Sequence, residues 1–178
     1  MSRLYLPLFL LFLLVIEGVA FDFLPLIVIE KGWLLAAHWL FVFLVLIALF
    51  YDLEYTYYSI LFAIISGLMV DLVYTNVIGV YMFMYGITIY FIHGMRKVLH
   101  TNFLVASLLT AVGLSLVDGG IYLIYSFIGI SQIDGMMYIT NRLLPTLAAN
   151  MIFFFVLYLL MKKKLVRWAA ERFDSNSS

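Results

Sequence analysis

Ionisable side chains lie within or at the edge of long apolar runs of the sequence, among them Glu17, Asp71, Asp118 and Arg142. An ionised side chain near the centre of a helix in lipid costs roughly 2.5–3.5 kcal/mol, so we expect all four to face a protein interior. Arg142 is the one cation available to the three acids, and we predict that it pairs with Asp71 or Asp118. The remaining carboxyl groups would then be protonated or hydrogen-bonded to serine or threonine.

A polar stripe follows Arg142, because Thr146 and Asn150 lie four and eight residues further along and share one helix face with it. Such a cluster has two interpretations. It specifies how the helices pack, or it forms a polar pocket or a socket for a partner. The candidate residues of the cluster are Glu17, Asp71, Asp118, Arg142 and Asn150.

The sequence contains no complete catalytic or metal-binding motif. Tyr51-Asp52 and Gly67-Leu-Met-Val-Asp71 are similar to parts of the intramembrane aspartyl protease motifs, but the second has the wrong spacing and Asp52 falls in an expected loop. HExxH, GxSxG and P-loop motifs do not occur, the three histidines lack metal-ligand spacing, and there is no cysteine. We therefore expect no enzyme activity, no metal and no cofactor.

The elements that must position these side chains are apolar helices. Of the 178 residues, 66% are hydrophobic and 11% are charged, and the mean hydropathy is +1.13. A water-soluble domain is about half apolar and about a quarter charged, so this composition indicates an integral membrane protein. Strand-like alternation is absent, and apolar runs of about 20 residues fit helices that cross a bilayer.

We predict an all-α membrane protein with six transmembrane helices in one bundle. The expected spans are residues 4–24, 33–51, 59–74, 77–93, 103–128 and 142–161, which make one domain over residues 1–161. Residues 162–178 are expected to form a basic amphipathic tail on the cytoplasmic membrane surface. Gly18-Val19-Ala20 resembles a signal-peptide cleavage site, but Glu17 interrupts the apolar run and the run continues to Leu24, so we favour a retained first helix.

The basic residues are distributed unequally between the two sides of such a bundle. Eight lie on the side of the two termini and two on the other: Arg3, Arg96, Lys97, Lys162, Lys163, Lys164, Arg167 and Arg172 against Lys31 and Arg142. The positive-inside rule therefore predicts a multi-pass membrane protein with both termini in the cytoplasm. The basic tail indicates a topology anchor in contact with anionic lipid, and not a nucleic-acid site.

Small residues recur at helical spacing in three of the expected spans, as they do where membrane helices approach closely. Pro145 is expected in the first turn of the last span, where its missing N–H costs nothing. The candidate helix-packing residues are Ser59, Ala63, Gly67, Gly79, Gly86, Ser107, Ala111, Ser115, Gly119 and Pro145.

Four strings of the sequence form a recognisable set: Gly67-Leu-Met-Val-Asp71-Leu, Val77-Ile-Gly79-Val-Tyr81-Met-Phe83, Lys97-Val-Leu-His-Thr-Asn102, and Asn141-Arg142-Leu-Leu-Pro145-Thr-Leu-Ala-Ala-Asn150. With these strings the sequence resembles the MreD family of rod shape-determining proteins, which implies a place in the bacterial cytoplasmic membrane. The family usually has aspartate before the arginine, so the resemblance does not carry a local salt bridge to Asn141.

The resemblance implies a non-enzymatic role. Proteins similar to this one act with the membrane-anchored protein MreC. Together they help to couple cytoplasmic MreB filaments to the elongation synthase, RodA with its class B penicillin-binding protein, so that sidewall peptidoglycan is inserted and the cell stays rod-shaped. The family fold also looks like the S component of ECF transporters, which makes a substrate-binding subunit of a small-nutrient importer the alternative function.

Overall fold

The computed structural model describes residues 4–20, 30 and 32–173, and within these ranges every regular element is helical. The elements are α1 (Tyr5–Val19), α3 (Trp39–Phe50), α4 (Tyr58–Tyr74), α5 (Val80–Val98), α6 (Phe103–Phe127), α7 (Gly135–Tyr138), the π-helical turn η3 (Ile139–Leu143) and α8 (Leu144–Phe173). Because α7, η3 and α8 run on as one helix, the described part has six helices. The predicted all-α fold is confirmed.

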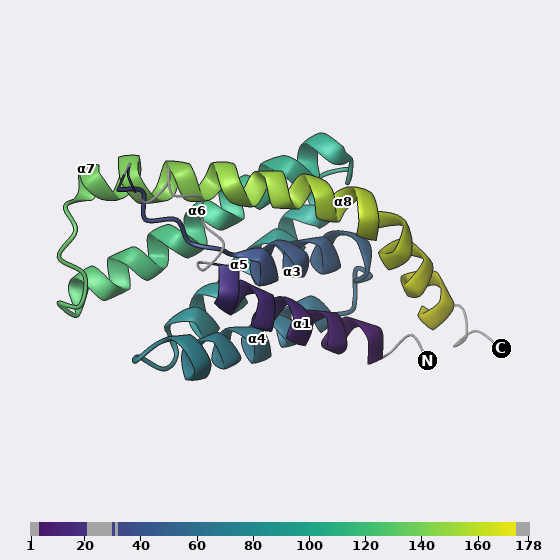
Figure 1. Ribbon diagram of the computed structural model, residues 1–178. Helices are drawn as coiled ribbons and strands as arrows, with labels where there is room; N and C mark the ends of the chain where they lie inside the picture. Colours follow the sequence, from purple (N-terminus) through teal and green to yellow (C-terminus); the bar gives the residue numbers. More distant parts are fainter. Residues whose placement is uncertain (1–3, 21–29, 31, 174–178) are drawn as a thin grey trace.

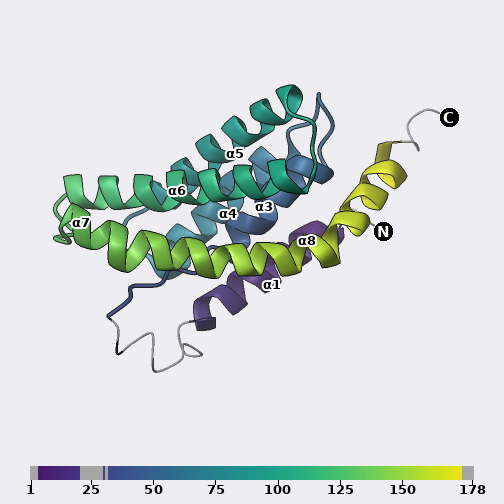
Figure 2. The ribbon, with the colours of Figure 1, turned by 90° about the horizontal axis from the view of Figure 1, so that it is seen from above.

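Two of these helices are long and apolar enough to cross a membrane, namely Phe103–Phe127 and the continuous helix from Gly135 to Glu171. Three shorter ones, α1, α3 and α4, are also apolar. Both described ends of the chain lie at the same end of the bundle, and α7 lies at the other end (Figures 1 and 2).

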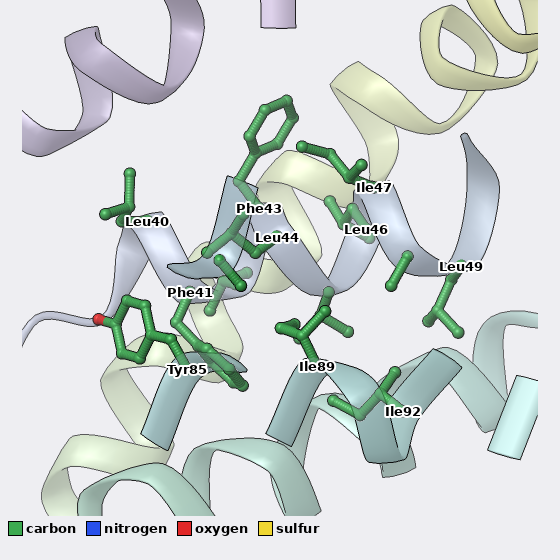
Figure 3. Close-up of a cluster of buried hydrophobic side chains, with 14 of the residues drawn as sticks. Leu40, Phe41, Phe43, Leu44, Leu46, Ile47, Leu49, Tyr85, Ile89 and Ile92 are labelled. Carbon is green, nitrogen blue, oxygen red and sulfur yellow. The ribbon is translucent and has the colours of Figure 1, made fainter. Parts of the chain in front are cut away.

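Helix α3 is the centre of the bundle. It lies between α8 on one side and α1 and α4 on the other (Figure 1), and it contacts α1, α4, α5, α6 and α8. Every residue from Leu40 to Phe50 is buried, as expected of a helix that is apolar on all sides. Its side chains interlock with Tyr85, Ile89 and Ile92 of α5 (Figure 3).

Helices α4 and α5 form the closest pair. The small stripe Ser59, Ala63, Gly67 and Asp71 is buried on one face of α4. A Cβ atom on Gly67 would lie 2.6 Å from the Met82 Cα atom, so the two backbones touch at this point. No other side chain would allow this approach, because the neighbouring atoms belong to backbone.

The structure differs from the expected spans at three places. The second span begins as a helix only at Trp39, and residues 33–38 have no regular secondary structure. The fourth span begins as a helix at Val80 and continues to Val98, beyond its expected end at residue 93. The last helix starts at Gly135 and runs to Phe173, so residues 162–173 continue it instead of forming a separate surface helix. Packing explains the continuation, since Leu165 and Ala169 are buried and the Trp168 ring stacks on Tyr5 at 5.6 Å. Residues 21–24 of the first span, Arg3, Lys31 and residues 174–178 lie outside the described part.

Candidate functional site

The non-helical segment 33–38 lies against the first part of the last helix, and Pro145 explains how it binds there. Proline has no N–H, so the carbonyl four residues earlier loses its helical partner. That carbonyl belongs to Asn141, in the π-helical turn, and it accepts the Leu34 N–H at 2.8 Å. A π-helical turn inside an α-helix is often found at functional sites.

Two polar side chains of α8 complete this backbone pairing. The Thr146 hydroxyl accepts the Ala36 N–H at 3.1 Å, and the Asn150 amide oxygen accepts the His38 N–H at 2.8 Å. The Asn150 amide nitrogen donates to the Ala36 carbonyl at 2.8 Å. Non-helical backbone at membrane depth needs such partners, because lipid offers none. Thr146 and Asn150 of the predicted polar stripe thus hold segment 33–38.

Asp118 of α6 is the point where three other segments meet. Its Oδ1 atom accepts from Arg142 Nη2 at 3.0 Å and Arg142 Nε at 3.2 Å, and lies 3.3 Å from His38 Nε2. Its Oδ2 atom accepts the Tyr138 hydroxyl at 2.8 Å. Asp118 is fully buried, whereas the Arg142 side chain keeps 25% of its surface exposed. Of the two partners predicted for Arg142, the structure brings Asp118 to it.

Asp71 binds backbone N–H groups and no cation among the described residues. Its Oδ2 atom accepts the N–H groups of Gly79 and Met82 at 2.9 and 3.0 Å, and its Oδ1 atom accepts that of Tyr81 at 3.0 Å. These donors are at the beginning of α5, where N–H groups lack helical partners and the helix dipole favours a negative charge. The carboxylate therefore fixes the turn between α4 and α5 from inside the bundle.

Glu17 does the same for α3. Its Oε2 atom accepts the Leu40 N–H at 2.8 Å, in the first turn of that helix, and its side chain is buried. Helix α3 begins in the middle of the apolar bundle, directly after segment 33–38. Glu17 thus binds a helix terminus that lies inside the bundle.

Two open cavities meet at Arg142. One of about 550 Å³ is lined by Glu17, segment 33–37, Tyr74, Tyr81 and Arg142. The other, of about 590 Å³, is lined by Tyr74, the turn at 75–77, Tyr81, Tyr125 and Arg142. The Arg142 Nη1 group has no hydrogen-bond partner among the residues that the structure describes. The hydrogen bonds around Asp118 can therefore hold the bundle in shape, while the free edge of the Arg142 guanidinium can bind a polar group in the cavities.

The other small-residue candidates lie in varied places. Gly86 is buried beside Ile64 of α4. Gly79 is not part of a packing face: it precedes α5 with φ +104°, a left-handed conformation that favours glycine. Pro145 is buried, but it lies well inside the continuous helix that starts at Gly135, so its expected place in a first turn, where the missing N–H costs nothing, is wrong. The remaining four are half-buried beside the core-facing side of α6, namely Ser107, Ala111, Ser115 and Gly119.

Sequence reasoning missed two parts of the polar network. His38 belongs to no motif in the sequence, but it is 1% exposed and its Nε2 atom lies 3.3 Å from Asp118 Oδ1. Asp52, which is expected in a loop, is buried and accepts the first N–H groups of α4, with Ser59 N at 2.9 Å. An aspartate a few residues before an apolar run was the available signal, because that is a common place for a helix-capping side chain.

The fold and the site together define an all-helical protein whose buried charges hold its own backbone. A family model described as rod shape-determining protein MreD matches residues 2–167. The chain is 25% identical over 150 residues to the "Rod shape-determining protein MreD" of Bacillus subtilis (strain 168), covering 84% of this chain and 86% of that protein. No solved structure matches the chain.

The chain belongs to the MreD family of rod shape-determining proteins. The resemblance found in the sequence is thereby confirmed, with a role in determining rod shape. MreD is a family of membrane proteins and is not a known enzyme family.

Proposed function

We propose that the protein is a non-enzymatic scaffold subunit of the bacterial elongation machinery. It partners MreC and thereby couples MreB filaments, directly or indirectly, to RodA and its class B penicillin-binding protein. The observation that carries this proposal is the family match over residues 2–167, which includes every buried charge described above.

The proposal includes six membrane-crossing helices with both termini in the cytoplasm. In that orientation the Asp118–Arg142 network faces the outer leaflet and the basic residues of α5 and α8 face the cytoplasm. Buried polar contacts that each have a single geometry support a scaffold role, because a partner helix requires a bundle surface of fixed shape. The small-residue faces and the Arg142 edge are candidate contacts for that partner.

Two experiments test the scaffold proposal. In the first, the tagged protein is purified from its own membranes in mild detergent and the proteins that accompany it are identified. Recovery of a single-pass MreC-like protein with cell-wall synthases supports the proposal. In the second, the chain is expressed in rod-shaped cells depleted of their own copy. Cells that round up despite normal membrane levels of the chain contradict the proposal.

A second function has one observation in its favour. The cavities of about 550 and 590 Å³ beside Arg142 could hold a small nutrient, as in a substrate-binding subunit of an importer. Such a subunit needs a coupling protein in the membrane, often docked on small residues of its first helix. Here α1 is rich in leucine and phenylalanine, with Gly18 near its far end. Recovery of a membrane coupling protein with paired ATPases in the same purification would favour the importer.

A further inference from the structure

A second polar cavity lies at the end of the bundle opposite the Asp118 network. It has a volume of about 570 Å³, and it opens where the C-terminal ends of α3 and α5 meet the 99–102 loop and α8. Its walls combine apolar side chains such as Phe50 and Val166 with two cations, Arg96 and Lys162. The cations come from segments 66 residues apart, so the fold and not a local run of charge brings them together.

Both cations are held in place with hydrogen-bond donors left over. Arg96 donates through Nη1 to the carbonyls of Ala48, at 3.1 Å, and of Asp52. These carbonyls end helix α3, and the contact leaves Nε and Nη2 of Arg96 without a hydrogen-bond partner among the described residues. The Lys162 ammonium donates to the Tyr158 hydroxyl at 2.7 Å, and it lies 5.4 Å from the centre of the Phe50 ring. An ammonium has three N–H donors, so two remain.

The one acid in the cavity wall, Asp52, acts electrostatically on Arg96, as does Glu54 nearby, but its carboxylate is hydrogen-bonded elsewhere. The Asp52 carboxylate is buried and faces the start of α4, where it accepts the N–H groups of Tyr58 at 3.2 Å and Ser59 at 2.9 Å. Burial raises the pKa of the Asp52 carboxyl, an effect that the hydrogen bonds from Ser59 partly oppose. The cavity wall therefore has two cations, one acid and five unused N–H donors beside apolar side chains.

We propose that this cavity binds a phosphate group between Arg96 and Lys162, with the apolar part of the ligand against Phe50 and Val166. Arginine and lysine side chains are the usual phosphate donors in proteins. Two sources share this chemistry, the headgroup of an anionic phospholipid in the cytoplasmic leaflet and a soluble organic phosphate. Lipid is the source that the apolar wall and the proposed orientation favour. The inference does not depend on which proteins the chain assembles with.

The test is native mass spectrometry of the full chain in mild detergent, titrated with phosphatidylglycerol. Phosphatidylcholine with the same acyl chains serves as the comparison lipid, and sn-glycerol 3-phosphate as the soluble probe. The variant is Lys162→Gln, and the matched control is Lys163→Gln, which removes the same charge from an exposed neighbour. We expect phosphatidylglycerol to bind more tightly than phosphatidylcholine. Lys162→Gln should weaken its binding about fivefold, the effect of one lysine at an anionic surface.

The outcomes separate the sources and can overturn the proposal. Retention of phosphatidylglycerol in the presence of equimolar sn-glycerol 3-phosphate assigns the cavity to lipid, and its displacement assigns the cavity to a soluble phosphate. Lys163→Gln should change binding less than about twofold, and Lys162→Arg should restore it, because the charge is kept. Equal binding of the two lipids, or equal losses in Lys162→Gln and Lys163→Gln, would mean that the basic surface attracts lipid diffusely and that the cavity binds no phosphate.

Discussion

Arg142 and Asp118 are joined by two hydrogen bonds, of 3.0 and 3.2 Å, between helices that are otherwise apolar. The same carboxylate also holds Tyr138 and lies against His38, so one buried charge connects α6, α7, η3 and segment 33–38. The arginine reaches it from the rim of two cavities. The ion pair thus connects the buried interior of the bundle to the end at which the two cavities open.

Replacing Arg142 by leucine should destabilise the protein strongly. The change leaves the Asp118 carboxylate buried without its guanidinium partner, and breaking a buried ion pair on one side costs about 3–5 kcal/mol. Thermal unfolding in detergent measures the loss. Arg167→Leu is the control, because Arg167 pairs with Glu171 on the surface and such pairs contribute little. The double variant Asp118→Leu/Arg142→Leu should recover part of the loss. Unchanged unfolding of Arg142→Leu would refute the structural role of the pair.

Asp71→Asn should weaken the turn between α4 and α5. In the parent protein both carboxylate oxygens of Asp71 accept N–H groups. The asparagine side chain keeps one acceptor oxygen, but its NH₂ group would face N–H donors in place of the second oxygen. We expect a loss of about 1–3 kcal/mol in the free energy of unfolding. Asp134→Asn is the matched control, since Asp134 caps the short helix α7 near the surface and asparagine caps equally well. Equal stability of the two variants would contradict the role assigned to Asp71.

Gly67→Ala and Gly94→Ala should have opposite effects although both change a glycine within a helix. A Cβ atom at Gly67 would lie 2.6–2.8 Å from backbone atoms of Tyr81 and Met82, so α4 and α5 must separate. A Cβ atom at Gly94 has no neighbour within 4 Å, and alanine there should stabilise the helix by about 0.5–1 kcal/mol. Unfolding temperatures of the two variants check this prediction. A Gly67→Ala protein as stable as the parent would show that the two helices are not in contact at this position.

Much of the fold could be predicted from the sequence, because apolar runs and small stripes act through local spacing. The all-α class follows from the runs, and the cost of charge in an apolar environment correctly turns Glu17, Asp71 and Asp118 to the inside. The spacing of Ser59, Ala63 and Gly67 identified the buried face of α4. These inferences need only the chain itself and no knowledge of which helices meet.

The non-helical segment 33–38 could not be predicted in the same way. Its residues are mostly apolar and continue into α3, so hydropathy alone extends the helix over them. The groups that bind the segment are Asn141, Thr146 and Asn150, more than 100 residues away in the chain. A separation of 80 residues likewise hid the contact between His38 and Asp118. Local patterns do not record which helix termini a distant side chain will bind.

Pro145 offers the most direct test of that long-range pairing. Replacing it by alanine supplies an N–H four residues after Asn141, and this N–H can bind the Asn141 carbonyl within the helix. The Asn141 carbonyl would then no longer accept the Leu34 N–H, a hydrogen bond of 2.8 Å in the parent protein. We expect faster hydrogen exchange at the Leu34 amide, by about tenfold if about 1.4 kcal/mol of protection is lost. The measurement is hydrogen–deuterium exchange of the detergent-purified protein.

Pro7→Ala provides the control for this experiment. Pro7 lies in the first turn of α1, where an added N–H has no helical carbonyl to bind, so the exchange at Leu34 should not change. A Pro145→Ala protein should also remain helical through residues 139–143, because the substitution improves the helix locally while it releases the segment. If exchange at Leu34 stayed the same in both variants, the segment would be held by Thr146 and Asn150 alone, and the missing N–H of Pro145 would have no part in holding it.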